Sequence, residues 1–543
     1  MLQDPLGVGG RGALERDRFC DNALMAGSAK GAKLRLADLV GALSIITDMG
    51  FGLPIGEAMR SCLVSTALAR KLDLSETEVR DAFYTALMLH IGCVSMSHET
   101  SVLFGDELAI TRAASMTDLA DPQDFVDTLI PEATRGLDAS ASEQLGTALI
   151  TSGPSFGRLY DTASGEVSRE TARRIGLPES TQRSLHEAGE LWIGGGGPRG
   201  LRGDEIAISA RIVRVASDAA FFDDIGNVDL SVAALKKRAG GSLDPSIVQT
   251  FVVDAEELLA EANTGDPRVR ILEVEPQPVE ERDVSELPEV ATAFADASDL
   301  KAPFMQSHST RVAALATAAA ERGGLDNANV QSLNVAALLH DIGRVGVSDA
   351  LWEKPGPLTT AEWEQVRTHP YHSERILAHS DTLSPMARIA GMHHERLDGS
   401  GYHRGSRASE IPTVARVLAA ADAFVAMTQE RPYRDALSAD QAADELAAEV
   451  RNGRLDADAA AAVLDAAGQG RTLRRGEMRP AGLSEREVEV LRLVADGHSN
   501  PEIAERLSIS RRTAEHHVQH IYTKIGVSTR PSAALFALEH GLI

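Results

Sequence analysis

The feature that most constrains the fold is an apolar run that ends in a charged pair. Val335–Leu339 are all apolar and are followed directly by His340-Asp341. Such a run is typical of a buried helix, and a buried polar pair costs free energy unless it is hydrogen-bonded or bound to metal. Further imidazoles and carboxylates occur throughout 308–422. We predict a helical domain that gathers these groups around a pair of divalent metal ions.

The candidate ligands are widely spaced, so only a folded domain can bring them together. Asp422 follows Ala419–Ala421 in the middle of a predicted helix, where an unpaired carboxylate would be costly. His340 and Asp341 are adjacent, and on a helix they would point about 100° apart. That arrangement suits an aspartate that bridges two ions. The full candidate set is His308, His340, Asp341, His369, His393, His394 and Asp422.

The first half of the chain repeats this framework without most of the ligands. Ala86–Gly92 parallels Ala336–Gly343, with Ile91 in the place of the aspartate. Glu57 replaces the first histidine, Ala188-Gly189 replace the histidine pair, and Ser217 replaces Asp422. The matched blocks are offset by 250 and by 205 residues, so a surplus of 45 residues (250 minus 205) falls within about 91–185. We expect a folded copy that holds no metal pair; the alternative is a regulatory pocket or a dimer surface.

Length and composition narrow the classes of protein. The 543 residues are too many for one core, and 43% apolar residues with only 4% aromatics favour helices packed through small side chains. A net charge of -25 excludes non-specific nucleic-acid binding by the whole protein, so any DNA contact must be local. The three cysteines lack a metal-binding or disulfide spacing, and no signal peptide or membrane-length apolar run is present. A cytoplasmic protein without membrane contact is expected.

A series of spaced motifs carries a family resemblance. In order they are His308, His340-Asp341-Ile342-Gly343, His369-Pro370, His393-His394-Glu395, Asp398-Gly399-Ser400-Gly401-Tyr402, Ile411-Pro412, Asp422 and Arg431-Pro432-Tyr433-Arg434. Together they resemble an HD-GYP domain, a branch of the HD metal-dependent phosphohydrolases. The resemblance implies an all-helical fold, a dinuclear or trinuclear centre of the iron or manganese type, and hydrolysis of cyclic di-GMP.

The same resemblance assigns roles to the candidate residues. It implies two divalent transition metal ions, most suitably iron or manganese, with Asp341 bridging them. One ion would be held by His308, His340, Asp341 and Asp422, and the other by Asp341, His369, His393 and His394. Asp341 and Arg344 are the catalytic candidates, and a loop with Asp398, Gly399, Gly401 and Tyr402 would face the substrate. Three positions depart from the family pattern: Arg344 for lysine, His403 for proline and Val425 for a second aspartate.

The last 62 residues predict a separate DNA-binding domain of four short helices. Ser484–Glu487 forms a capping box, Asn500-Pro501 opens a second helix, and Arg511–Ile525 is the third. The sequence from Leu483 to Arg530 resembles the LuxR/GerE-type helix-turn-helix, which implies that the third helix enters the major groove. The DNA contacts expected are phosphate contacts from Arg511, Arg512 and Lys524 and base contacts from Glu515, His516 and Gln519.

These observations predict an all-α chain with tandem HD-like bundles and a LuxR-type domain. The expected divisions are a disordered leader (1–32), a degenerate HD-GYP-like domain (33–262), a linker with a helix leading onward (263–300), an HD-GYP-like phosphohydrolase (301–467), a basic linker (468–481) and the helix-turn-helix (482–543). We expect a transcriptional regulator, as a homodimer, that hydrolyses or senses a cyclic dinucleotide or other phosphodiester and binds duplex DNA. The alternatives are a non-catalytic transcription factor and a phosphohydrolase for another phosphoester.

Overall fold

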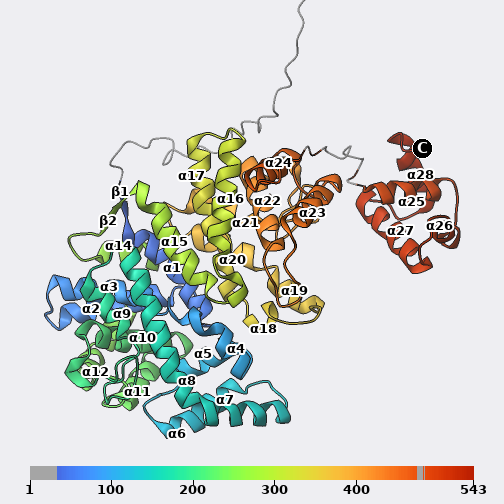
Figure 1. Ribbon diagram of the computed structural model, residues 1–543. Helices are drawn as coiled ribbons and strands as arrows, with labels where there is room; N and C mark the ends of the chain where they lie inside the picture. The colour runs from blue at the N-terminus through green and yellow to red at the C-terminus, as the bar shows by residue number, and fades with distance from the viewer. Residues whose placement is uncertain (1–32, 472, 474–480, 482) are drawn as a thin grey trace, which may run out of the picture.

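The computed structural model describes residues 33–471, 473, 481 and 483–543. The predicted leader (1–32) and most of the basic linker (468–481) lie outside the described residues. The prediction of an all-α chain is confirmed: within the described part, the one sheet is the pair β1 (Lys33–Arg35) and β2 (Glu281–Asp283). None of the helices in that part combines the length and the apolar character that a membrane crossing requires. Figure 1 shows two helical lobes in contact and a small C-terminal domain beside them.

The first copy consists of a helical framework interrupted by a set of extra helices. The framework helices are α1 (Leu36–Gly50), α2 (Glu57–Lys71), α3 (Glu76–Met88), η1 (Cys93–Met96), α9 (Glu179–His186), η3 (Gly203–Glu205), α10 (Ile208–Ile225), α11 (Val228–Arg238), α12 (Pro245–Val253), α13 (Ala255–Ala262) and α14 (Pro267–Val274). The intervening helices are α4 (Ser97–Phe104), α5 (Glu107–Met116), α6 (Pro122–Asp124), the π-helix η2 (Phe125–Leu129), α7 (Ile130–Ala133) and the long α8 (Ala139–Arg174). These intervening helices lie within about 91–185, where the repeat predicts the surplus residues of the first copy.

The second copy repeats the framework with a shorter insertion. Its helices are η4 (Val284–Glu286), α15 (Leu287–Asp299), η5 (Pro303–Met305), α16 (His308–Arg322), α17 (Asn327–Leu338), η6 (Ile342–Gly346), α18 (Asp349–Trp352), α19 (Thr360–Val366), α20 (His369–Leu377), α21 (Ser384–Gly391), η7 (Ala408–Glu410), α22 (Thr413–Met427), α23 (Ala439–Arg451) and α24 (Ala457–Ala466).

The two copies pack reciprocally into one body with a shared apolar core. Helix α1 of the first copy packs on η6 and α20 of the second, while α15 of the second packs on η1 and α8 of the first. The segment 263–300, predicted as a linker with a helix leading onward, is largely ordered into this body. Helix α14 packs on α1 and α2, and β2 pairs antiparallel with β1. Each copy therefore contributes structure to its neighbour, and the largest core runs through both lobes.

Equivalent hydrogen bonds fix the register between the copies and correct the sequence alignment. The Gly92 amide donates to Ser168 Oγ at 3.1 Å, and the Gly343 amide donates to Ser373 Oγ at 2.9 Å. The offset in this part is thus 251 residues (343 minus 92), one more than the sequence match assumed. His90, and not Ile91, therefore stands at the position of Asp341, and Leu89 stands at the position of His340.

Gly343 is required at the close approach of η6 to α20. A Cβ atom there would lie 2.2 Å from the His369 carbonyl oxygen and 2.5 Å from the Ser373 backbone nitrogen. We expect Gly343→Ala to lower the free energy of unfolding by about 3 kcal/mol, because backbone atoms of two elements must separate. Urea unfolding checks this against Gly356→Ala, where an added Cβ has no heavy atom within 4 Å. Equal urea midpoints for the two variants would contradict the close approach.

The C-terminal domain has its own small core. Helices α25 (Glu485–Ala495), α26 (Asn500–Arg506), α27 (Arg511–Ile525) and α28 (Arg530–Glu539) close around buried apolar residues that form a cluster separate from the main core. The capping box at Ser484 is confirmed, whereas the second helix is capped by Ser499, one residue before the predicted Asn500. A short turn joins α26 to α27, as expected for a helix-turn-helix.

Candidate metal centre

All seven candidate ligands converge in the second copy, and each is placed at or near a helix end except one. His308 is the first residue of α16 and His369 the first residue of α20, while His393 and His394 follow α21. Asp422 lies inside α22, as predicted. The remaining pair, His340 and Asp341, was predicted on a helix, and this is wrong: α17 ends at Leu338 and the pair occupies the turn before η6.

Backbone carbonyl groups orient three of the imidazole rings toward a common point. His340, His369 and His393 each donate from Nδ1 to the carbonyl oxygen three residues earlier, at 2.7, 2.6 and 2.6 Å. His308 donates from Nδ1 to Gln429 Oε1 at 2.7 Å. Each ring thereby presents Nε2 to the centre, because its other nitrogen is already hydrogen-bonded. This is the arrangement by which proteins fix histidines as metal ligands.

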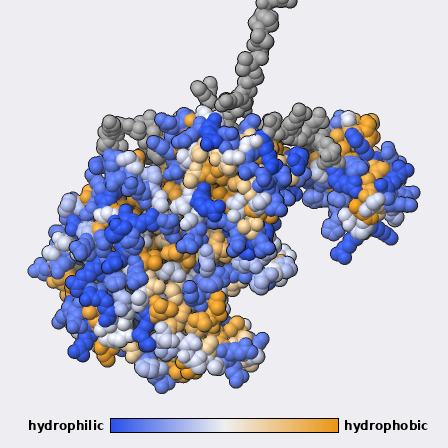
Figure 2. Space-filling view, viewed as in Figure 1, coloured by the Kyte–Doolittle hydropathy of each residue, from blue (hydrophilic) through white to orange (hydrophobic). Residues whose placement is uncertain are grey.

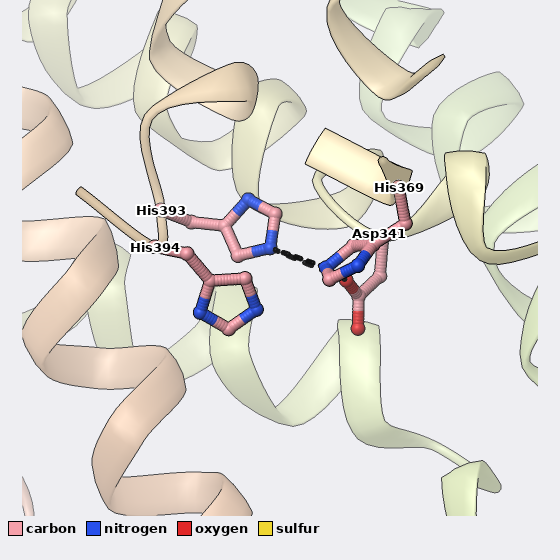
Figure 3. Close-up of side chains that lie close together, drawn as sticks. All are labelled: Asp341, His369, His393 and His394. Carbon is pink, nitrogen blue, oxygen red and sulfur yellow. Dashed lines mark hydrogen bonds and ion pairs between the residues drawn. The ribbon is translucent and has the colours of Figure 1, made fainter. Parts of the chain in front are cut away.

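Asp341 lies between two groups of ligands. Its Oδ1 is 3.4 Å from Nε2 of both His369 and His393, and its Oδ2 is 3.7 Å from His308 Nε2 and 3.6 Å from His340 Nε2. Figure 3 shows Asp341 beside His369, with His393 and His394 facing them. The donor atoms fall into two sets, each within 4.8 Å: Asp341, His369, His393 and His394, and His308, His340 and Asp422.

The donor atoms fit metal ions better than they fit one another. His340 Nε2 and Asp341 Oδ1 are buried and have no hydrogen-bond partner, which is rare for buried polar atoms in a folded protein. Asp422 Oδ1 lies 3.3 Å from His308 Nε2 and 3.8 Å from His340 Nε2. Imidazole nitrogen and carboxylate oxygen are the donors that first-row divalent metals accept. The described residues thus contain clusters that can hold metal ions, in the second copy only.

Electrostatics also favour a cation at this centre. Burial lowers the pKa of His369 to about 3 and the pKa of His394 well below its usual range, so both rings stay neutral and keep a lone pair. Burial alone would lower the pKa of His340 as well, but the carboxylates of Asp341 and Asp422 outweigh it and raise that pKa to about 9. The carboxylates that favour a proton beside His340 equally favour a metal cation.

Arg344, the catalytic candidate, lies at the rim of the centre. Its guanidinium is 3.4 Å from Asp341 Oδ2 and stacks over the Trp352 ring at 3.7 Å. Two residues near it were missed as site residues. Arg431, in the last family motif, lies 5.1 Å over the Phe304 ring, and burial lowers its pKa to about 10. Trp352 also contacts the His369 ring at 5.4 Å, a tertiary contact that no sequence motif signals.

The predicted substrate loop reaches the centre through one residue. The Tyr402 ring lies 4.7 Å from the His394 ring, between centroids. Asp398 instead accepts hydrogen bonds from the amide and hydroxyl of Ser400, so it shapes the loop. Gly399 has φ +81, and a Cβ atom at Gly401 would lie 2.4 Å from the Arg396 backbone nitrogen. The two glycines therefore permit the fold of the loop that places Tyr402.

The DNA-binding candidates lie on the third helix of the small domain, α27. Five of them share its exposed face: Arg511, Arg512, Glu515, His516 and Gln519. Arg511 is paired with Glu515 at 3.0 Å. Lys524 differs, because its ammonium binds Glu487 of α25 at 2.9 Å and its side chain is half-buried. The structure therefore places Lys524 in a contact within the domain.

Comparison with known proteins decides what this arrangement is. An HD domain model matches residues 293–459, and a model of the bacterial regulatory proteins of the luxR family matches residues 481–537. A 3'3'-cGAMP-specific phosphodiesterase 3 of Vibrio cholerae is 31% identical over 415 residues, which are 75% of this chain and 89% of that protein. The chain belongs to the HD-GYP phosphodiesterase family. To this HD-GYP part it adds a LuxR-type DNA-binding domain.

Other relatives match shorter stretches of the chain. A cyclic di-GMP phosphodiesterase of Thermotoga maritima is 43% identical over 130 residues, 24% of this chain and 35% of its own. A crystal structure of a cyclic GMP-AMP-specific phosphodiesterase of V. cholerae (V-cGAP3) covers 80% of this chain and 98% of that one, at 26% identity and a TM-score of 0.56. That share is too large for one copy, so the structural similarity extends over the tandem arrangement.

Proposed function

We propose that the second copy (301–467) binds two divalent transition metal ions, iron or manganese, and hydrolyses a 3',3'-cyclic dinucleotide. The observation that supports this most is the position of Asp341, which offers one carboxylate oxygen to each of the two ligand groups.

The first copy (33–262) is proposed as a degenerate HD-GYP-like domain. Residues 482–543 form the DNA-binding output of a homodimer, and occupancy of the HD-GYP part biases the dimer that binds DNA.

The protein's own groups set up the reaction around the ions. Divalent ions at such a site activate water for attack and stabilise negative charge on phosphoryl oxygens. The neutral rings of His369 and His394 keep their lone pairs for binding at physiological pH. Gln429 and the backbone carbonyl groups hold the other rings in orientation, so little reorganisation is needed when the ions bind.

Cationic and aromatic residues at the rim suit a nucleotide phosphodiester. The planar guanidinium group of Arg344 can donate two parallel hydrogen bonds to two phosphate oxygens. Its stacking on Trp352 fixes the plane of the group. Arg431 adds a second positive charge near Arg344, beside Phe304. The Tyr402 ring next to His394 offers a face on which a purine base can stack. These features support a cyclic dinucleotide over a small phosphomonoester.

The test is turnover of 3',3'-cGAMP and cyclic di-GMP by the purified protein, with metal content measured on the same sample. We expect bound iron or manganese and hydrolysis of at least one dinucleotide. Arg344→Gln should lower kcat/KM about 100-fold, because the phosphate loses the charged hydrogen bonds of the guanidinium group. Metal content should stay unchanged, because the metal-ligand candidates remain. Arg388→Gln, at an exposed arginine of the same domain, is the matched control. A protein without transition metal and without hydrolysis of either dinucleotide would overturn the proposal.

A further inference from the structure

The degenerate first copy contains a cavity of about 230 Å³. It lies where the second copy has its metal centre, since the corrected register maps six of the seven ligand positions onto its lining. Those six positions are Leu89, His90, Ser164, Ala188, Gly189 and Ser217. Serine, alanine and glycine leave open the space that imidazole and carboxylate groups fill in the second copy. The residues that abolish the metal site therefore also create a cavity.

The cavity extends beyond the equivalent of the metal centre into an apolar lobe. The extra helices α4–α8 form this lobe around their own small hydrophobic cluster. Hydrophobic residues also gather on the surface of this region, over α5 and α8 (Figure 2). Within this lobe the cavity is lined by Phe104, Ile110, Phe125, Leu129, Leu149 and Phe156. A lobe of this composition suits a hydrocarbon chain.

The cavity lining also includes polar and charged side chains, among them the cation Arg214. Arg214 makes no hydrogen bond or close ion pair among the described residues, and its Nε is buried without a partner. The other lining arginine, Arg238, is already paired with Asp218 at 2.5 Å. The hydroxyl of Tyr160 is also buried in the lining, beside Cys93 and Ser164. An anionic head group would satisfy these donors.

The neighbouring titratable groups do not oppose an anion strongly. Burial lowers the pKa of His90 to about 3, so this ring is neutral, and it stacks on Phe51 with centroids 4.2 Å apart. Burial raises the pKa of Asp161 to about 7, so this carboxyl group readily takes up a proton and loses its negative charge when an anionic ligand lies beside it. Burial likewise raises the pKa of Cys93 to about 11, which keeps its thiol neutral.

We propose that the cavity of the first copy is a binding site for an amphipathic anion, a medium-chain fatty carboxylate, with its head group at Arg214 and its chain among the phenylalanine side chains. A carboxylate accepts the pair of parallel hydrogen bonds that a guanidinium group donates, and the burial of Arg214 Nε strengthens such bonds. This site is separate from the dinucleotide site and needs no metal.

A direct structural path connects this cavity to the metal centre. Helix α5 lines the cavity with Ile110 and begins at Glu107. The Glu107 carboxylate is buried against the second copy and accepts a hydrogen bond from Lys301 Nζ at 2.8 Å. Glu107 also accepts a hydrogen bond from the Asp349 amide at 2.9 Å, at the start of α18. Helix α18 ends at Trp352, on which Arg344 stacks. A ligand that shifts α5 would therefore change the position of Arg344; this consequence rests on the proposed function.

Binding is tested on the full-length protein by isothermal titration calorimetry with decanoate, and with decanol as the neutral counterpart. We expect saturable binding of one decanoate per chain and weaker binding of decanol. Arg214→Gln should weaken decanoate about tenfold or more, because the head group loses its charged partner. Arg112→Gln is the matched control, since Arg112 lies on the wall helix α5 but is exposed. Absence of decanoate binding, or equal affinity for both arginine variants, would overturn the proposal.

A cavity-filling variant separates loss of the site from loss of the fold. Gly157 lines the cavity from α8, and a Cβ atom there meets no heavy atom within 4 Å. Gly157→Leu should abolish decanoate binding and leave the thermal midpoint unchanged or raised, because leucine also favours the helix. Unchanged binding in this variant would contradict the assigned site. The rate of dinucleotide hydrolysis tests the path through α5 separately. If decanoate binds without changing that rate, the path is refuted and the binding site stands. If the protein hydrolyses no dinucleotide at all, the result counts against the proposed function.

Discussion

Asp341→Asn is expected to abolish dinucleotide hydrolysis, lowering kcat by about 1000-fold or more, and to reduce bound metal by at least one ion per chain. Asparagine keeps the size of the side chain but offers one neutral oxygen in place of the carboxylate that we propose as the bridge. The two groups of ligands, with Asp341 Oδ1 3.4 Å from His369 and Oδ2 3.6 Å from His340, would then lose the charge that they share. Turnover and elemental analysis of the same sample measure both effects.

The control for this substitution is Asp465→Asn, at an exposed aspartate of α24 that pairs with Arg322. It removes the same charge from the same domain at a position where a surface ion pair contributes little. We expect wild-type turnover and metal content from it. If Asp341→Asn retained full metal content and turnover, the bridging role of this carboxylate would be wrong, whatever the identity of the substrate.

That these seven side chains lie close together could be predicted from the sequence, because each candidate ligand is embedded in a short motif with a recognisable chemistry. The local geometry could not. The apolar run before His340 predicts a helix through the pair, yet α17 ends at Leu338. The chain turns there because Gly343 packs directly on the backbone of His369, a contact between segments distant in sequence. The turn, rather than helical periodicity, aims His340 and Asp341 at the same centre.

The first copy illustrates a second limit of sequence reasoning. Alignment by identity placed His90 opposite His340, whereas hydrogen bonds to Ser168 and Ser373 place it opposite Asp341. One residue of register changes which ligand position each side chain occupies. The cavity could not be predicted from a sequence pattern either, because its lining comes from α4, α5, α8 and α10 together. What the sequence did predict correctly is the location of the surplus that forms the apolar lobe.

In the DNA-binding helix too, the sequence pattern predicts the bounds of the helix but not the tertiary contacts of its side chains. Its bounds, Arg511–Ile525, agree with the prediction, because Ser510 caps one end and Gly526, at φ +70, ends the other. The role of Lys524 as a phosphate contact was inferred from charge alone. Its ion pair with Glu487 depends on how α25 packs on α27, which a single sequence does not reveal.

Truncation before Gly482 is expected to abolish binding to duplex DNA and to leave dinucleotide hydrolysis within about twofold of the full-length rate. The small domain and the HD-GYP body have separate hydrophobic cores, so removing one exposes little apolar surface on the other. The seven candidate ligands all lie before the cut. Electrophoretic mobility shift with DNA selected by the full-length protein and the hydrolysis assay on the same preparation measure the two outcomes.

A point variant shows whether lost binding reflects lost contacts or a lost domain. Arg512→Gln removes a charge from the exposed face of α27, and Arg486→Gln removes one from α25, where Arg486 pairs with Glu489 at 2.6 Å. We expect Arg512→Gln to weaken DNA binding about tenfold and to flatten its dependence on salt, because fewer counterions are released. Arg486→Gln should have little effect on DNA binding. Retention of sequence-specific binding by the truncated chain would place the DNA contact on the HD-GYP body, whose surplus of negative charge opposes it.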